Sequence, residues 1–140
     1  MTAPDTYFAD PAGTPTEDGR FYRVDQLAAV EIVSGLTLRP IVSTDTMLSF
    51  ARYEPFAEAP RHAHVEAQIF VMLEGEMEVE LGDEVHAMRP GDVAVVPSWL
   101  PHRATAGPAP APAYQLDIFN PPRAGVLEQI AADQPKRSDD

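Results

Sequence analysis

PRHAHVEAQIFVMLEGE, residues 60–76, is the stretch of sequence that decides how this chain folds. We interpret residues 62–73 within it as one continuous β-strand. Side chains at positions i, i+2 and i+6 of an ideal strand share one face. His62, His64 and Gln68 have this spacing. Imidazole nitrogen is a common ligand of divalent metals, so this face is expected to supply half of a metal site.

A second part of the chain is needed to complete such a site. His102 follows the segment Pro97-Ser98-Trp99-Leu100-Pro101 and begins another expected strand, so it is the candidate third histidine. His86, the remaining histidine, lies in an acidic hairpin and is expected to be exposed. Without His102 and the surrounding motifs, the paired histidines of residues 62–64 would instead suggest surface residues on an edge strand.

Length, charge and composition restrict the class of protein. The chain has 140 residues, no cysteine and a formal net charge of −12. The length indicates one domain, and the missing cysteines exclude disulfides and thiolate metal sites. The acidity argues against nucleic acid or an anionic membrane as a partner. No apolar run is long enough to cross a membrane, and residues 1–5 do not resemble a signal peptide, so we expect a cytoplasmic protein.

Strand patterns with glycine and proline turns predict an all-β sandwich or barrel. Residues 76–81 alternate between glutamate and apolar side chains, and Gly82-Asp83 suits a two-residue hairpin turn. Residues 93–96 are predicted to be a strand buried on both faces. The other expected strands are 36–42, 47–53, 62–73, 84–89, 102–106 and 114–119.

The domain organisation is predicted from composition. Residues 1–19 are rich in threonine, proline and acidic residues, and we expect them to form a flexible N-terminal arm. Residues 20–123 form the predicted domain. Residues 124–140 are expected to hold a short helix, near residues 126–131, followed by a polar tail.

Two motifs resemble those of the cupins. Residues 60–76 are similar to the first cupin motif, and residues 82–102, with Arg89-Pro90-Gly91-Asp92 inside them, are similar to the second. The resemblance covers roughly residues 35–123. It implies a small antiparallel jelly-roll barrel around one divalent metal ion, which would be zinc, nickel or iron. It also implies the metal ligands His62, His64, Gln68 and His102.

The last expected strand carries a second resemblance. Residues 116–123 are similar to the end of the small cupins that linearise unsaturated uronates, which also use glutamine in place of the usual glutamate ligand. That resemblance implies that Asp117, Phe119 and Arg123 line the site. Zinc polyketide cyclases are similar single-domain cupins, so both substrate classes stay open. The chain departs from the family at Glu66-Ala67, where His-Glu is common.

The proposed ligand set has a chemical consequence. Three imidazoles and the amide of Gln68 are all neutral, so a bound divalent ion keeps its full charge and acts as a stronger Lewis acid. The two-histidine, one-carboxylate set is typical of ferrous oxygenases. The neutral set therefore favours non-redox chemistry at a carbonyl compound. The alternative for Gln68 is a core amide that bonds to the backbone.

Three further residues are catalytic candidates. Asp117 has the opposite strand parity from Leu116 and Ile118, so it is either an inward general acid and base or an outward, solvated carboxylate. Arg123 suits a substrate carboxylate, or else is a surface residue after the Pro121-Pro122 pair. Glu66 is a further ligand, a general base or, if a bulge intervenes, a rim residue.

We therefore predict a metal-dependent isomerase, cyclase or lyase that acts on a small, oxygen-rich carbonyl compound. Asp117 would move the proton and Arg123 would orient an anionic group. Two alternatives remain open, a metal-dependent dioxygenase and a non-catalytic cupin that binds a small ligand. The expected partners are the small-molecule substrate and a second copy of the chain, in a homodimer formed through an edge strand and the N-terminal arm.

Overall fold

Ten strands and two helical segments make up the part of the chain that the computed structural model describes, residues 7–8, 13–108 and 111–133. The elements are η1 (Val24–Gln26), β1 (Val30–Val33), β2 (Leu36–Ser43), β3 (Thr46–Tyr53), β4 (Glu58–His62), β5 (Ala67–Glu74), β6 (Met77–Leu81), β7 (Glu84–Met88), β8 (Val93–Val96), β9 (His102–Ala106), β10 (Ala113–Asn120) and α1 (Ala124–Asp133).

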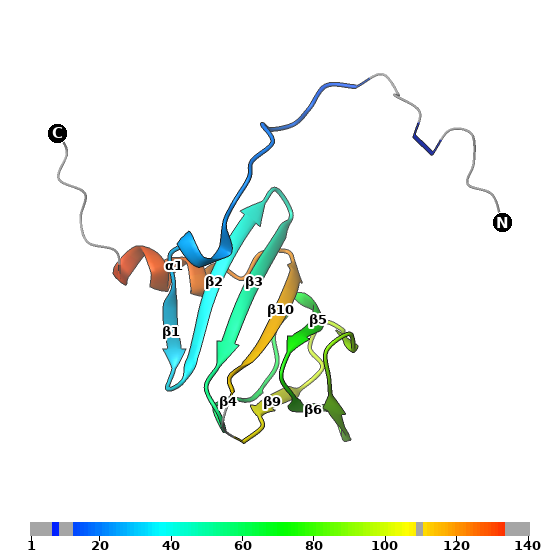
Figure 1. Cartoon of the computed structure of the whole chain (residues 1–140). Coiled ribbons are helices and arrows are strands. Elements are labelled where there is room, and N and C mark those ends of the chain that lie inside the picture. The colour runs from blue at the N-terminus through cyan, green and yellow to red at the C-terminus, as the bar shows by residue number, and fades with distance from the viewer. Residues whose placement is uncertain (1–6, 9–12, 109–110, 134–140) are drawn as a thin grey trace.

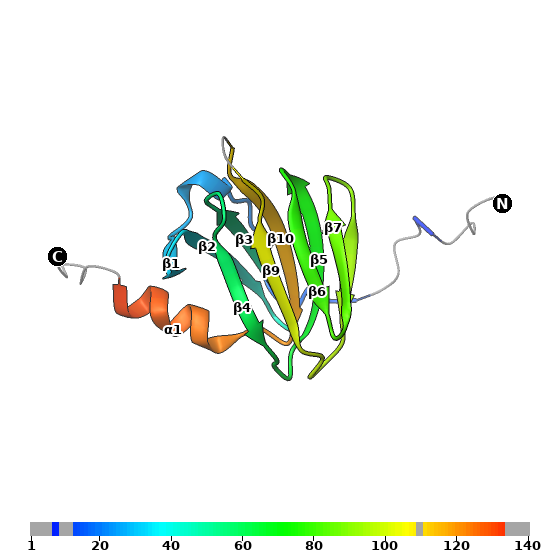
Figure 2. The ribbon, with the colours of Figure 1, turned by 90° about the horizontal axis from the view of Figure 1, so that it is seen from below.

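The strands form two antiparallel sheets that face each other (Figures 1 and 2). One sheet has the order β1-β2-β3-β10-β5-β8, and the other has the order β4-β9-β6-β7. The chain passes repeatedly from one sheet to the other, so strands distant in sequence become neighbours. This arrangement confirms the predicted all-β fold, and α1 confirms the short C-terminal helix.

Alternating burial shows which side chains fill the space between the sheets. In β3 and β10, every second residue is buried, and Met47, Met72 and Met77 are among the largest fully enclosed side chains. These flexible apolar side chains fill an irregular core. The same inward face of β3, β5 and β10 also carries polar residues, namely Ser49, Gln68, Gln115 and Asp117. Burying polar groups is costly unless they are hydrogen-bonded, so these residues are unusual for a core.

The predicted continuous strand over residues 62–73 is wrong. β4 ends at His62 in the four-stranded sheet, residues 63–66 form a connection, and β5 begins at Ala67 in the six-stranded sheet. The two histidines and Gln68 therefore do not share one strand face. The strand patterns on either side are genuine, but their apparent continuity hides a crossing between sheets.

Strand β8 also differs from its prediction. Val93 and Val95 are 57% and 63% exposed, whereas Ala94 and Val96 are buried, so only one face of this strand is buried. An apolar run predicts burial on both faces only if a second layer covers the strand. In contrast, the predicted hairpin turn at Gly82-Asp83 is confirmed, because it joins β6 to β7.

The ends of the domain contain features that strand patterns did not indicate. β1 pairs with β2, and α1 lies beside β1 at this end of the six-stranded sheet (Figure 2). Much of the predicted arm over residues 1–19 lies outside the described residues, as does part of the predicted C-terminal tail. Within the described ranges, no helix has the length and apolarity that crossing a membrane requires.

Candidate metal centre

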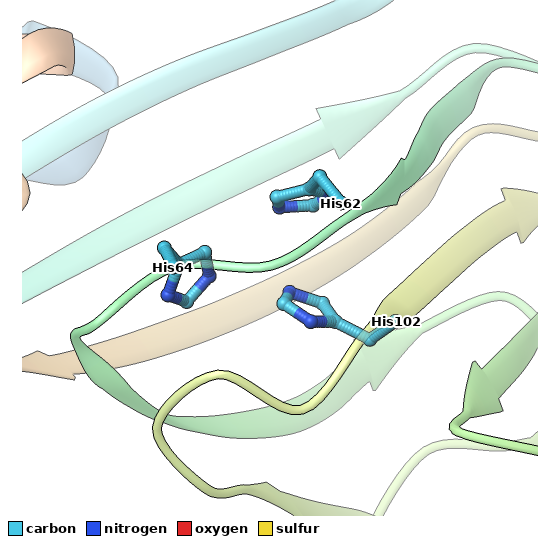
Figure 3. Close-up of side chains that lie close together, drawn as sticks. All are labelled: His62, His64 and His102. Atoms are coloured by element: carbon cyan, nitrogen blue, oxygen red, sulfur yellow. The ribbon is translucent and has the colours of Figure 1, made fainter.

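Three histidines, two of them only two residues apart in the sequence, meet between the sheets (Figure 3). His62 is the last residue of β4, His64 lies in the connection to β5, and His102 is the first residue of β9. The pairing of β4 with β9 places His62 opposite His102. One ring nitrogen from each histidine lies within 4.8 Å of the others, so the three rings could share one ion.

Backbone carbonyl groups fix the orientation and the tautomer of each ring. Nδ1 of His62 lies 2.6 Å from the carbonyl oxygen of Pro60. Nδ1 of His64 lies 2.9 Å from the carbonyl oxygen of Glu66, and Nδ1 of His102 lies 2.9 Å from that of Leu100. A carbonyl oxygen only accepts hydrogen bonds, so each neutral imidazole must carry its proton on Nδ1. The lone pair of each ring is consequently on Nε2, a common arrangement for metal-binding histidine.

The free nitrogens lack the protein partners that buried polar atoms normally have. Nε2 of His102 is buried and has no hydrogen-bond partner among the described residues. Nε2 of His64 lies 3.2 Å from Oε1 of Gln68. Because the proton of His64 is on Nδ1, its Nε2 is an acceptor, as is Oε1 of Gln68, so no proton lies between these two atoms. A divalent cation fits this arrangement because it would satisfy these lone pairs together.

Burial keeps the rings of His64 and His102 in the neutral form that a metal requires. Burial lowers the pKa of His102 to about 4. Burial also lowers the pKa of His64, and the cationic Arg123 acts in the same direction. Both rings are therefore neutral at pH 7. Since protonated imidazole cannot bind a metal, these shifts favour binding at neutral pH.

A hydrogen-bond network fixes the amide of Gln68. Its Nε2 donates to Oδ1 of Asp117 at 2.7 Å, which leaves Oε1 on the side of His64. Gln115 donates to the same carboxylate, at 2.8 Å to Oδ1 and 2.7 Å to Oδ2. Because the Asp117 carboxylate only accepts when it is ionised, it selects the amide orientation in which oxygen faces the histidines.

Asp117 itself is an enclosed carboxylate. It is 6% exposed and shares the inward face of β10 with Gln115 and Phe119. Burial raises its pKa from 3.8 to about 6, although the hydrogen bonds from Gln115 and Gln68 act in the opposite direction. A carboxyl group with such a pKa can both take up and release a proton near neutral pH.

Arg123 and Glu66 form a pair on the other side of His64. Nε of Arg123 lies 3.6 Å from Oε1 of Glu66, and this same oxygen lies 3.7 Å from Nδ1 of His64. Glu66 therefore approaches the protonated nitrogen of His64 rather than its lone pair. Arg123 also lies over the ring of Phe119, 5.7 Å from its centroid, and is one-third exposed.

A cavity of about 380 Å³ opens beside the histidines. Its polar lining residues come from both sheets and from the segment after β10; they are Ser49, His62, Gln68, His102, Asp117 and Arg123. Glu66 and His64 do not belong to the lining, so Glu66, although it pairs with Arg123, lies outside the cavity. The carboxylate in the cavity is that of Asp117.

Sequence reasoning missed several residues of this site. Gln115 shares strand parity with Asp117, so the same alternation that placed Asp117 inside would also have placed Gln115 there. Ser49 pairs directly with Asp117 across β3 and β10, and that register could not be deduced from the sequence alone. The contributions of β1 and α1 to the cavity, through Ile32, Val33 and Val126, depend on how the ends of the domain pack.

Solved structures with a similar fold include an RmlC-like cupin from Shewanella frigidimarina and KdgF from Halomonas sp. The first is 25% identical with a TM-score of 0.70, and covers 77% of this chain and 96% of its own. The second is 26% identical with a TM-score of 0.72, and the alignment covers 77% of this chain and 98% of KdgF.

A third similar structure is the polyketide cyclase RemF from Streptomyces resistomycificus, which is 22% identical with a TM-score of 0.66 and covers 74% of this chain and 80% of its own. A search of curated proteins found no match. The family model described as "Cupin domain" matches residues 49–119, a segment that contains the three histidines, Gln68 and Asp117. The chain therefore belongs to the cupin family.

Proposed function

We propose that this cupin is a metal-dependent enzyme that catalyses isomerisation, cyclisation or elimination of a small carbonyl compound without redox chemistry. One observation carries the proposal: three histidines and the amide oxygen of Gln68 converge beside the buried carboxylate of Asp117. A site that combines a Lewis acid with a proton carrier is suited to reactions in which a proton moves next to a carbonyl group.

His62, His64 and His102 would hold the ion through Nε2, and Gln68 would add its Oε1. Zinc, nickel and iron all accept imidazole ligands. A divalent ion bound by four neutral groups would polarise a carbonyl oxygen of the substrate. Among the described residues, the cluster of side chains that could hold an ion contains no carboxylate. This donor set favours the non-redox proposal over a ferrous dioxygenase.

Asp117 would transfer the proton. Its Oδ1 accepts from both Gln68 and Gln115, whereas Oδ2 accepts from Gln115 alone. We assign the transferred proton to Oδ2, because this oxygen keeps more free acceptor capacity. The enclosed position of the carboxylate excludes bulk water, which would otherwise compete for the proton.

Arg123 would bind an anionic group of the substrate. Among the described residues that line the cavity, Arg123 is the one with a permanently cationic side chain. Its planar guanidinium can bind a carboxylate through two hydrogen bonds. The carboxylate of Glu66 pairs with Nε of Arg123, and the guanidinium lies over the ring of Phe119. These contacts limit the rotamers of Arg123, so we assign Glu66 a positioning role.

The outer face of the six-stranded sheet supports the proposed homodimer. Ile69, Leu73, Val93 and Val95 on β5 and β8 are between 40% and 63% exposed and form an apolar surface. Exposed apolar patches of this kind are typical of interaction sites. Apart from Glu74 at the end of β5, the exposed side chains of these two strands carry no charge, so two copies could pack there with few acidic residues in contact. A second copy related by a two-fold axis would present the same surface.

Removing one histidine should abolish stable metal binding. We expect His62→Ala and His102→Ala to bind zinc more weakly by a larger factor than the roughly 10- to 100-fold associated with residues that only support ligands. His86→Ala is the matched control, because that histidine is exposed in β7. Titration of protein without an affinity tag would measure the affinities. Wild-type affinity in both site variants would refute the assignment.

Asp117→Asn should lose turnover but keep the metal. Asparagine preserves the size of the side chain but removes its titratable group, so the rate should fall by about 10²- to 10⁴-fold. The assay requires a substrate, and unsaturated uronates and aromatic polyketide precursors should both be tried. Metal content and melting temperature serve as controls. Normal turnover would show that Asp117 carries no proton, and loss of metal or fold would assign it a structural role.

Val95→Lys should convert the dimer to a monomer. A charge placed on the exposed face of β8 would be buried in the proposed interface without a partner, which is strongly destabilising. Light scattering coupled to size-exclusion chromatography would measure the mass. Val85→Lys on β7 is the control, since Val85 is similarly exposed, at 53%, but lies in the other sheet. A monomeric wild type, or a dimeric Val95→Lys, would contradict the proposal.

A further inference from the structure

The part of the cavity lining that lies at the β1 edge of the six-stranded sheet is apolar. Ile32 and Val33 come from β1, Leu36 and Leu38 from β2, and Val126 from α1. Ile32 and Val33 are each 39% exposed although they line a cavity, which means that the edge strand presents apolar surface to open space. Surface of this kind is stabilised when an apolar ligand covers it.

Most of the polar atoms elsewhere in the site already have partners within the protein. Gln68 and Gln115 donate to Asp117, and the histidines donate through Nδ1 to the backbone. Two atoms of lining residues are exceptions: Nε2 of His102, which we assign to the metal, and the hydroxyl of Ser49. It lines the cavity, it is 1% exposed, and it has no hydrogen-bond partner among the described residues. One free hydroxyl can satisfy one oxygen of a ligand but not several.

This distribution bears on the substrate class that the proposed function leaves open. A sugar acid carries hydroxyl groups around its whole ring. In this cavity those on the side of Ile32, Val33 and Leu38 would lose water and gain no partner, which is costly for each group. A ligand with an apolar ring on that side and its oxygens at the other end would avoid this cost. Pockets that bind small molecules commonly combine an apolar lining with a few polar groups in this way.

We infer that the site accepts an amphiphilic carbonyl compound with an apolar ring, in preference to a polyhydroxylated sugar acid. The inference rests on the proposed function for the identity of the site. The apolar ring packs against Ile32, Val33 and Val126, and the oxygen-bearing end reaches Ser49, Arg123 and the histidines. Specificity therefore comes from β1 and α1, which lie outside the two motifs that resemble the cupins.

Two carboxylates of equal charge test the inference, 2-naphthoate and galacturonate. Both can approach Arg123 and the metal site, but only naphthoate offers an apolar ring. Calorimetry with the zinc-loaded protein should show at least tenfold tighter binding of naphthoate. Ile32→Thr should weaken naphthoate binding by about tenfold, the order of effect that one or two apolar groups produce in a hydrophobic pocket. Val85→Thr, on an exposed strand away from the cavity, should leave it unchanged.

Equal or tighter binding of galacturonate would overturn the inference, and so would binding of neither probe. An unchanged affinity in Ile32→Thr, with the melting temperature preserved, would place naphthoate elsewhere and also overturn it. Because neither probe needs to react, the result is independent of catalysis. Normal turnover in Asp117→Asn would refute the proposed mechanism while leaving the preference for an apolar ring intact.

Discussion

Short-range hydrogen bonds from histidine to the backbone are the constraint on which this site depends. In each of the three rings, Nδ1 is bound to a carbonyl oxygen two residues away in the sequence. Local geometry therefore sets the tautomer, and the fold needs only to bring the three segments together. It does so by ending β4 at His62 and starting β9 at His102 in adjacent strands. All three lone pairs then fall on Nε2, and one ring nitrogen of each histidine lies within 4.8 Å of the others.

The second level of organisation links the donor set to the proposed acid and base. Asp117 accepts a hydrogen bond from the amide nitrogen of Gln68, and this contact holds the amide oxygen on the side of His64. Gln115 completes the arrangement from the same strand as Asp117. One buried carboxylate thus orients a candidate ligand and lies where a substrate proton would be transferred. Burial raises its pKa to about 6, which suits that second role.

Much of the fold followed from local patterns in the sequence. The alternation in residues 76–81 and the Gly82-Asp83 turn predicted a hairpin that the structure contains, and the three histidines were expected to meet. The continuous strand over residues 62–73 was wrong because both flanks have strand patterns, and only tertiary contacts reveal that the chain changes sheets between them. The exposure of Val93 and Val95 likewise depends on what lies outside the sheet. The apolar lining from β1 and α1 was missed because its elements lie outside the motif region.

A crystal structure of the zinc-loaded protein, with anomalous data collected at the zinc edge, tests the central claim most directly. The account predicts one strong peak per chain, about 2.0–2.1 Å from Nε2 of His62, His64 and His102, with Oε1 of Gln68 as the fourth protein ligand. Asp117 should remain hydrogen-bonded to Gln68 and away from the metal. Coordination through Nδ1, a carboxylate of Glu66 or Asp117 bound to the ion, or a peak outside the histidine cluster would contradict the account.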